Sequence, residues 1–461
     1  MAATEVDLAF AGVARQAELV RDGEASPREL VELALERIAA LDPQLNAFRV
    51  VLADQALADA DRAGAVGADD RGPLHGVPVA IKDDQAVAGQ ALTLGTGAHD
   101  DQPQPADSEI VRRLREAGGL VVGITRVPEL TQWPFTETAT GGITRNPWDP
   151  NRTPGGSSGG SGAAVAAGMV PVATASDGAG SIRIPAACCA LFGLKPQRDR
   201  IPLTPRDEGW HGLAHLGVLT RSVRDSAVVL DALTGEAWAE ELEAENSPHP
   251  PLRIALSTKI PPPLLARLEP EQHVALEETA ALLRDLGHEV VQRDPDYSPR
   301  MSIALVTRLL SGVYDEARAM PFPERLERRT RQQAFVGGQL RRFLGWARRN
   351  EAADAARLNA LFDDVDVLLT PALASLPLPV GRFEGRSGPV TFDGVSRFLP
   401  WLPAWNHAGN PAAAVPAGFT PGGVPTAVQL VAAPHGEALL LRLAAQLEAA
   451  RPWADRRPPV A

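Results

Sequence analysis

Glycine and serine are concentrated in residues 152–162 of this chain, which read RTPGGSSGGSG. A second segment of the same kind, residues 176–185, reads SDGAGSIRIP. Glycine loses more backbone freedom on folding than any other residue, so this density indicates unusual dihedral angles or a backbone that closely approaches a ligand. No secondary-structure requirement explains it. The two segments therefore indicate a site that carries chemistry.

Three interpretations of residues 155–162 were compared. A phosphate-binding loop would have a lysine followed by serine or threonine directly after its last glycine, but Gly162 is followed by Ala163 and Ala164. A flexible linker would not continue into the apolar small-residue run 163–172, which predicts a helix packed tightly in a core. The remaining interpretation is a hydrolase site, in which glycines let backbone amides face a developing oxyanion while serines move protons. We favour the hydrolase site.

Length and composition set the bounds. A chain of 461 residues allows about three domains of roughly 150 residues, and 44% hydrophobic with 22% charged residues is ordinary for a globular protein. The net charge of −12 disfavours a general role on nucleic acid or on an anionic membrane. The two cysteines, Cys188 and Cys189, are neighbours, so they do not form a disulfide framework.

The first residues predict the compartment. Glu5 and Asp7 stand where a secretory signal would have a basic start and an apolar run. No stretch of about 20 apolar residues suggests a membrane span. We therefore expect a cytoplasmic protein that has neither a membrane nor a nucleic acid as partner.

Alternating helices and strands predict an α/β protein. Ser26, Pro27 and Glu29 form a capping box that starts a helix. Residues 107–117 predict another helix, followed by an apolar strand at 120–124. The same order recurs later, with a helix at 271–286 and strands at 252–256 and 290–291. Residues 247–251 (SPHPP) are the best linker candidate, and we favour a stiff loop over a domain boundary.

The chain resembles the amidase signature family, and three segments carry the resemblance. Residues 155–162 resemble its serine-glycine signature, residues 178–185 (GAGSIRIP) its nucleophile segment, and residues 74–83 (LHGVPVAIKD) its lysine strand. Residues 144–149, 193–196 and, more loosely, 409–431 extend the match. The resemblance implies a single amidase domain over residues 1–461, whose core is a large mixed β-sheet covered by helices on both faces. Within it we expect an N-terminal helical part (1–69), a signature core (70–235), a variable substrate-side region (236–400) and a C-terminal part of the core (401–461).

The resemblance also implies a Ser-Ser-Lys triad. Ser181 would be the nucleophile, Ser157 the bridging serine after a cis peptide bond at Gly156, and Lys82 the terminal base. A lysine acts as a base only when it is neutral, so it must be buried enough for its pKa to fall, and the apolar residues 79–81 are consistent with such a dry strand. No metal and no cofactor is expected.

The loop before the nucleophile is implied to form the oxyanion hole. The backbone amides of Gly178, Ala179, Gly180 and Ser181 would stabilise the developing charge. Ala179 departs from the family, which usually has two glycines before the nucleophile, so a left-handed dihedral angle at this position would be strained. Asp177 and Arg183 flank the loop and are predicted to pair and support it. Ser158, Ser161 and Ser176 are predicted to be loop hydrogen-bonding residues rather than catalysts.

The same resemblance leaves the substrate open. The A subunit of glutamyl-tRNA(Gln) amidotransferase, a glutaminase, is the alternative within the family. Its small hydroxyl pair aligns with Pro134-Phe135, and its acidic substrate-binding position aligns with Leu399. We therefore expect an apolar pocket for uncharged aryl or alkyl amides, formed by Trp133, Phe135, Leu399, Trp401 and Trp405. The competing interpretation is that these aromatic residues are simply core.

An alternative of another class is an inactive scaffold or binding protein of the same fold, which loss of a triad residue would have favoured. The expected partner is a small-molecule amide, and a homo-oligomer is left open.

Other candidate residues are predicted to be structural. His211 and His215 have the spacing of two metal ligands on a helix, but no acidic residue lies between them and Gly212 argues against a helix. Cys188 and Cys189 follow small residues, where cysteine usually acts as a small buried hydrophobe. Eight arginines in residues 325–349 predict a solvated helix face.

Overall fold

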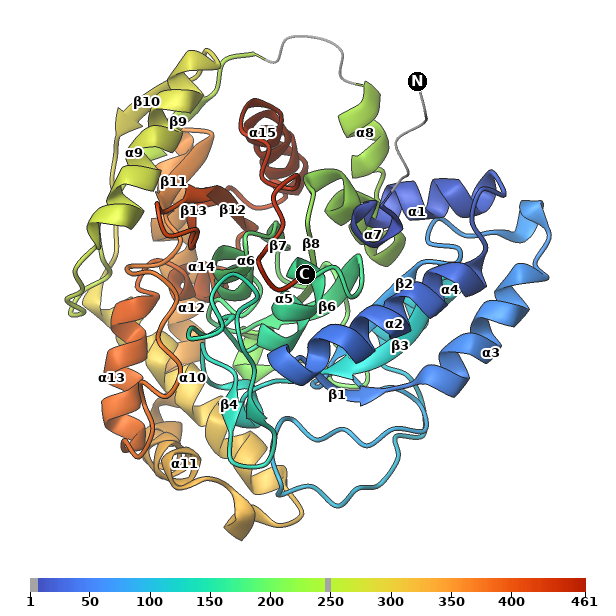
Figure 1. The fold of residues 1–461 in the computed structure, drawn as a ribbon. Helices are drawn as coiled ribbons and strands as arrows, with labels where there is room; N and C mark the ends of the chain where they lie inside the picture. Colours follow the sequence, from blue (N-terminus) through green and yellow to red (C-terminus); the bar gives the residue numbers. More distant parts are fainter. Residues whose placement is uncertain (1–6, 245–249) are drawn as a thin grey trace.

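The computed structural model describes residues 7–244 and 250–461 as a mixed β-sheet covered by helices (Figure 1). A five-stranded sheet has the order β1 (Phe48–Val51), β3 (Leu120–Thr125), β2 (Pro78–Lys82), β6 (Val172–Asp177) and β8 (His215–Thr220). A six-stranded sheet has the order β10 (Glu289–Gln292), β9 (Arg253–Leu256), β11 (Val367–Pro371), β13 (Pro425–Ala432), β12 (Ala412–Phe419) and β7 (Gly193–Lys195). Phe192 and Thr220 exchange two backbone hydrogen bonds of 3.0 and 3.3 Å, which join the sheets where β7 meets β8. The predicted large mixed sheet is confirmed.

Helices cover both faces of this sheet and extend beyond it. In Figure 1 the N-terminal helices α1–α4 lie on the right and α9–α13 on the left, with β6, β7 and β8 between them. β4 (Glu137–Thr138) and β5 (Gly142–Ile143) form a separate hairpin. The helices are α1 (Gly12–Arg21), α2 (Pro27–Leu45), α3 (Ala53–Gly64), α4 (Glu109–Glu116), α5 (Gly159–Ala166), α6 (Arg183–Cys189), α7 (Val223–Thr234), α8 (Trp238–Ala244), α9 (Pro270–Asp285), α10 (Pro299–Ala319), α11 (Arg328–Leu340), α12 (Leu344–Asn359), α13 (Gly388–Phe398), α14 (Pro403–Ala408) and α15 (Glu437–Ala450).

Successive residues of the strands contribute to two different hydrophobic cores. On β2, Val79 and Ile81 belong to the core formed with α4, α7, α9 and α15, whereas Ala80 belongs to the core formed with α2, α5 and α6. Strand side chains alternate between the two faces of a sheet, so both faces are buried. This explains why the central strands read as continuous apolar runs rather than as an alternation of apolar and polar residues.

The core on the α5 face is built from small residues. The strands present Ala80, Ala173 and Ala175 to it, and α5 itself reads GGSGAAVA. At Gly160 an added Cβ would lie 2.5 Å from the carbonyl oxygen of Ala47 and from the amide nitrogen of Arg126. The glycines of this segment therefore let a helix lie directly against backbone, as the sequence analysis expected of a close approach.

Most of the predicted elements are confirmed, and one is wrong. The capping box at Ser26 and Glu29 starts α2, and the predicted helices and strands near 107–124 and 252–291 are present. The predicted helix over 163–172 is wrong, because α5 starts earlier, at Gly159, and ends at Ala166. Gly168 has a left-handed φ of 66° and Met169 donates back to Ala164, which is the hydrogen bonding of a glycine-terminated helix. Residues 247–249 of the predicted linker lie outside the described residues.

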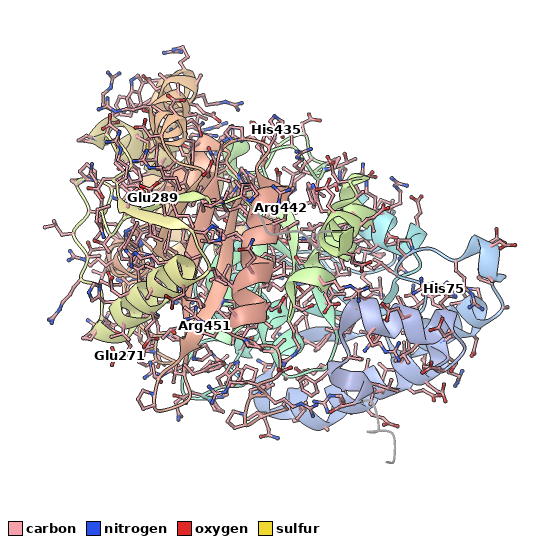
Figure 2. All side chains as sticks on the ribbon, turned by 90° about the horizontal axis from the view of Figure 1, so that it is seen from above. His75, Glu271, Glu289, His435, Arg442 and Arg451 are labelled. Atoms are coloured by element: carbon pink, nitrogen blue, oxygen red, sulfur yellow. The ribbon has the colours of Figure 1, made fainter. Side chains whose placement is uncertain are left out.

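The view from above shows how far the chain spreads around the sheet. Glu271 on α9 and Glu289 on β10 lie at one end of the molecule and His75 at the other, with Arg442 on α15 between them (Figure 2). None of the described helices combines the length and the apolar character that crossing a membrane requires. The division into an N-terminal part, a core and a substrate-side region stays a prediction.

Candidate active site

The predicted site residues meet because β2 and β6 are parallel neighbours. Parallel strands bring their carboxyl ends to the same edge of a sheet, and Lys82 is the last residue of β2 while Asp177 is the last of β6. The two serines precede helices: Ser157 lies two residues before α5, and Ser181 lies two residues before α6. Because α5 packs against both α6 and β2, Lys82, Ser157 and Ser181 converge at this edge, although 75 residues separate the first two.

Lys82 is completely buried and its ammonium group has three partners. Its Nζ donates to Ser157 Oγ at 2.8 Å and to Ser176 Oγ at 2.6 Å, and it lies 3.1 Å from Asp84 Oδ2. Burial lowers the pKa of Lys82 from its ordinary value, and the Asp84 carboxylate opposes part of that fall. A lysine in this environment loses its proton more readily than one in water.

Ser157 follows a cis peptide bond from Gly156, as the resemblance implied. An added Cβ on Gly156 would lie 2.5 Å from the carbonyl oxygen of Trp133 and 2.7 Å from the amide nitrogen of Phe135, so only glycine fits there. Ser161 donates to the carbonyl of Thr174 at 2.8 Å, as predicted for a residue that holds the loop.

The sequence did not indicate Asp84 as a site residue. Ser176 forms hydrogen bonds, as predicted, but its partners are site residues: its hydroxyl contacts Lys82 Nζ and donates to Asp84. Asp84 stands two residues after Lys82, just beyond β2. A carboxylate directly following a buried lysine strand is the signal that could have identified it, since a buried cation requires a counter-charge or a lowered pKa.

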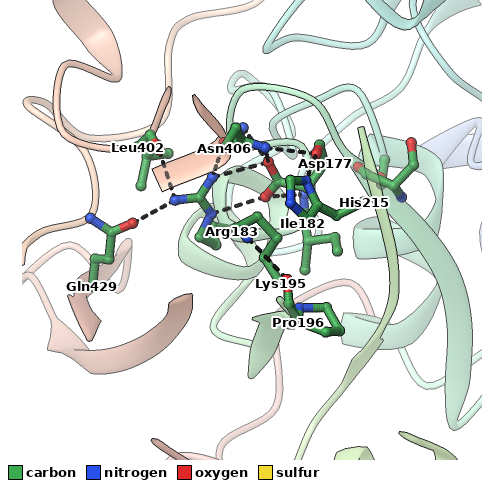
Figure 3. A network of polar contacts seen from close by, with 12 residues as sticks. Asp177, Ile182, Arg183, Lys195, Pro196, His215, Leu402, Asn406 and Gln429 are labelled. Carbon is green, nitrogen blue, oxygen red and sulfur yellow. Dashed lines mark hydrogen bonds and ion pairs between the residues drawn. The ribbon is translucent and has the colours of Figure 1, made fainter. Parts of the chain in front are cut away.

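Asp177 and Arg183 form the predicted pair, and both side chains are fully buried (Figure 3). The guanidinium donates to both carboxylate oxygens, at 2.9 and 3.0 Å, and also to Asn406 and Gln429. The positive charge of Arg183 and its hydrogen bonds hold the pKa of Asp177 well below its ordinary value, against the effect of burial. This network ties the loop at 178–182 to α14 and β13.

The loop amides are not equivalent. Gly180 N donates to Asp177 Oδ1 at 2.6 Å and Ile182 N to Asp177 Oδ2 at 3.2 Å. The backbone amides of Gly178, Ala179 and Ser181 have no hydrogen-bond acceptor within the described residues. The Gly180 amide, predicted for the oxyanion hole, is thus already bonded within the loop, which leaves the other three.

Ala179 causes none of the predicted strain. The left-handed φ of the loop, 131°, is at Gly180, and Ala179 is not among the residues with positive φ. An added Cβ on Gly180 would lie 2.7 Å from Leu402 Cδ1. Glycine is therefore required at position 180 and not at position 179, where this chain departs from the family.

Two cavities meet at Ser181. The larger, of about 530 Å³, is lined mainly by apolar side chains, among them Leu264, Leu305, Val306, Leu309, Phe392 and Leu399. The smaller, of about 110 Å³, is lined by Ser157 and by polar residues that include Asp84, Gln104 and Glu316. Ser181 and Trp210 line both cavities. No hydrogen bond joins Ser157 and Ser181 in the described part of the chain, although both hydroxyls border the smaller cavity.

Of the five residues predicted for the substrate pocket, two line the larger cavity and three do not. Trp133 and Leu399 line the larger cavity. Phe135 instead stacks between Trp133 and Phe383, with ring centroids 5.9 and 5.4 Å apart. Trp401 and Trp405 are fully buried core residues, and Trp405 packs near Phe362. The interpretation of the aromatic residues as core was right for these three.

The remaining walls come from segments that carried no signal in the sequence. They are contributed by residues 261–265, by residues 301–310 of α10 and by residues 389–397 of α13. Each segment is either short or has the amphipathic pattern of an ordinary surface helix. Composition alone therefore did not distinguish these segments from surface elements that line no cavity.

The structural roles predicted for the histidines and cysteines agree with their surroundings. His211 lies 3.0 Å from Asp315, whereas His215 is buried in β8 and contacts the carbonyl of Leu213 at 2.8 Å, so the pair does not share a helix face. Among the described residues no group of acidic, histidine or cysteine side chains could hold a metal ion. Cys188 and Cys189 are buried, and burial raises the pKa of both thiols.

The arginine-rich segment is only in part the predicted solvated face. Arg328 and Arg331 are exposed on α11. Arg329 instead lies over an aromatic pair, with its guanidinium carbon 5.1 Å from the ring centroid of Phe135 and 5.8 Å from that of Trp133. It therefore covers the aromatic wall behind the site.

Comparison with known proteins identifies the family of this chain. The family model described as Amidase matches residues 29–441. The chain belongs to the amidase signature family. The protein named "Putative amidase AmiB2" from Mycobacterium tuberculosis (strain ATCC 25618 / H37Rv) is 49% identical over 98% of this chain and 99% of its own length. An acylamidase from Rhodococcus erythropolis is 35% identical over 99% of this chain and 98% of its own length.

A solved amidase structure shares the fold. The structure of 6-aminohexanoate cyclic dimer hydrolase complexed with substrate superposes with a TM-score of 0.89 and 32% identity, covering 99% of this chain and 100% of that one. The protein is therefore an enzyme that hydrolyses amide C–N bonds.

Proposed function

We propose that the protein hydrolyses uncharged carboxylic acid amides through an acyl-enzyme on Ser181. The observation that carries the proposal is the contact of a buried lysine with a serine beside the cavities: Lys82 Nζ lies 2.8 Å from Ser157 Oγ, and Ser157 and Ser181 border the same cavity. A serine hydroxyl is a weak nucleophile until a base takes its proton. A lysine whose pKa is lowered by burial supplies that base.

In the proposed reaction Ser181 Oγ attacks the amide carbonyl while its proton passes through Ser157 to Lys82. The free amides of Gly178, Ala179 and Ser181 are available to the oxyanion, and such preorganised donors contribute roughly 3 kcal/mol each to transition-state stabilisation. The same proton then returns through Ser157 to the amine nitrogen as the C–N bond breaks. Water cleaves the resulting acyl ester.

The apolar lining of the larger cavity supports an uncharged substrate. The two charged residues recorded in its wall, Asp393 and Arg397, pair with each other at 3.0 Å. A substrate charge in this cavity would be left without a partner, and an unpaired buried charge is costly to desolvate. Pro134 and Leu399, which stand where the transamidating subunit has polar groups, both line it.

Trapping and substitution test the nucleophile. A fluorophosphonate is expected to label Ser181, and Ser181→Ala is expected to abolish amide hydrolysis with an unchanged thermal midpoint, because it removes the attacking oxygen and little volume. Ser158→Ala, which changes a hydroxyl of the same loop, is the matched control and should retain activity. Stoichiometric labelling of Ser157 or Cys189 would overturn the assignment.

A substrate panel tests the substrate class against the alternatives. The isolated chain is assayed with glutamine, short aliphatic amides, aryl amides and long-chain amides, and kcat/KM is expected to be higher for neutral apolar amides than for glutamine. A preference for glutamine, or activity that appears only with a partner protein and tRNA, would establish the amidotransferase reading instead. Inactivity on every amide, together with no labelling of Ser181, would establish the scaffold reading.

A further inference from the structure

The two cavities at Ser181 differ in character, and Ser157 borders only one of them. The larger, of about 530 Å³, is mainly apolar, and the smaller, of about 110 Å³, has mixed walls in which carboxylates and carboxamides lie among apolar side chains such as Leu92, Leu203 and Leu216. Ser157 lines the smaller cavity, as do Ser176 and Asp84, the partners of Lys82. Ser157 and the two side chains that contact Lys82 Nζ besides it therefore lie on the side of the smaller cavity.

This placement distinguishes the two ends of an amide. When the C–N bond breaks, the amine nitrogen must receive a proton from the group that took it from Ser181 Oγ. In the proposed reaction that group is Ser157, so the nitrogen must be within its hydrogen-bond reach. The amine part of the substrate then extends into the smaller cavity, and the acyl part, on the other side of the carbonyl carbon, extends into the larger one.

We propose that the larger cavity is the acyl site and the smaller cavity the amine site, and that the enzyme releases large apolar acids from ammonia or from short polar amines. This inference rests on the proposed function. A cavity of this size suits a drug-sized apolar group. Leu305, Val306 and Leu309 line it from α10, and Leu264 and Phe392 from other segments.

The walls of the amine site give the chemistry of the leaving group. Its side chains include two carboxylates, Asp84 and Glu316, and the carboxamides of Gln85 and Gln104. Glu316 pairs with Arg206 at 2.5 Å. These carboxylate and carboxamide oxygens accept hydrogen bonds from N–H or O–H groups, and a short amine that carries such a group can pair with them, whereas an alkyl or aryl amine would leave them unpaired.

A pair of isomeric substrates tests the assignment. N-ethylhexanamide and N-hexylacetamide have the same composition, so they differ only in which side of the amide carries the long chain. We expect at least tenfold higher kcat/KM for N-ethylhexanamide, since each further buried methylene of the acyl chain contributes roughly a fourfold factor. A hydroxyl at the end of the ethyl group is expected to raise kcat/KM further.

Substitutions assign the effect to the two cavities. Leu309→Trp is expected to reduce the ratio of kcat/KM for hexanamide over acetamide at least tenfold. Ile303→Trp, on an exposed part of the same helix, is the matched control and should leave that ratio unchanged. Gln104→Leu is expected to reduce the preference for the hydroxyethyl amine over the ethyl amine and to leave the dependence on acyl length in place.

The outcomes separate this inference from the function on which it rests. Equal rates for the isomers, or a preference for N-hexylacetamide, would overturn the assignment of the cavities while amide hydrolysis itself stands. Labelling of Ser181 without cleavage of either isomer would also overturn it. Absence of both labelling and cleavage would overturn the proposed function.

Discussion

At the scale of single residues, the burial of Lys82 determines how activity responds to pH. A lysine accepts a proton only when neutral, and the pKa of Lys82 is lowered by burial. In the proposed mechanism the free enzyme is inactive where Lys82 is protonated, so kcat/KM is expected to rise with pH through this lowered pKa and then reach a plateau. The measurement is kcat/KM for a neutral amide across the pH range. A rate that falls steadily above neutrality, in enzyme that is still folded, would contradict the role of Lys82.

Asp84 tunes the same titration. Its carboxylate, 3.1 Å from Lys82 Nζ, raises the pKa of the lysine and so opposes the effect of burial. The other acidic group that acts on Lys82 in this way is Asp177. We expect Asp84→Asn to lower the pKa of Lys82, so that the rising limb of the kcat/KM profile moves to lower pH.

Two observations distinguish this effect from a loss of structure. Asp296→Asn, at an exposed ion pair with Arg357, is the control and should leave the profile in place. If Asp84→Asn lowers kcat/KM by the same factor at every pH, Asp84 holds the geometry of the site and does not tune the lysine.

A site residue could be predicted when a local sequence motif marks it, and not when only the folded structure brings it to the site. Lys82, Ser157 and Ser181 stand in dense local segments, so the resemblance alone identified them. The contact of Ser176 with Lys82 arises only when the ends of β2 and β6 come together, and no local pattern records it, whereas Asp84 follows Lys82 closely enough to leave a local signal. Trp401 and Trp405 were misplaced because an aromatic side chain in a core and one in a pocket wall look the same in a sequence.

At the scale of elements, the close packing of α5 fixes its residues. An added Cβ on Gly160 would lie 2.5 Å from backbone atoms of Ala47 and Arg126, which cannot move aside as a flexible side chain can. We expect Gly160→Ala to destabilise the fold by about 1–3 kcal/mol, as overpacked cores do. The free energy of unfolding is measured with urea.

Gly345 on α12 provides the matched substitution. An added Cβ there would lie 3.3 Å from the end of the flexible Arg349 side chain, so Gly345→Ala is expected to be neutral or to stabilise the helix by up to about 1 kcal/mol. If the two variants are equally stable, the close packing of α5 against the backbone does not require glycine at position 160.

The elements themselves were mostly predictable, with an informative exception. Capping residues and apolar spacing located α2, α4 and α9, because these helices present ordinary amphipathic patterns. The boundaries of α5 could not be located in this way, because a helix buried on all sides has no polar face to mark its period. Gly168, the left-handed glycine just beyond the end of α5 at Ala166, would have been the better guide.

At the scale of the whole molecule, Arg183 connects the two sheets. It lies on α6 and donates to Asp177 at the end of β6 in one sheet and to Gln429 on β13 in the other. Removing one partner of a buried ion pair leaves the other charge uncompensated, which typically costs 3–5 kcal/mol. We expect Arg183→Met to lower the free energy of unfolding by about that amount and to lower kcat/KM as the loop at 178–182 loosens.

An exposed ion pair gives the comparison. Arg293 pairs with Asp364 at 2.6 Å, with both side chains more than half exposed, so Arg293→Met is expected to cost about 0–1 kcal/mol. Thermal and urea unfolding of the two variants measure the difference. Equal losses would show that the Arg183 network does not hold the two sheets together.

The walls of the larger cavity and the residues proposed to move the proton come from different parts of the chain. The former are contributed largely by residues 261–265, 301–310 and 389–397, and the latter by residues 82–84, 157 and 176–181. Mutations in these three segments therefore reshape the walls without replacing any residue of the proposed proton path. We therefore expect substitutions in these three segments to change which amides are cleaved. An engineered library confined to them is expected to vary substrate specificity while it retains kcat.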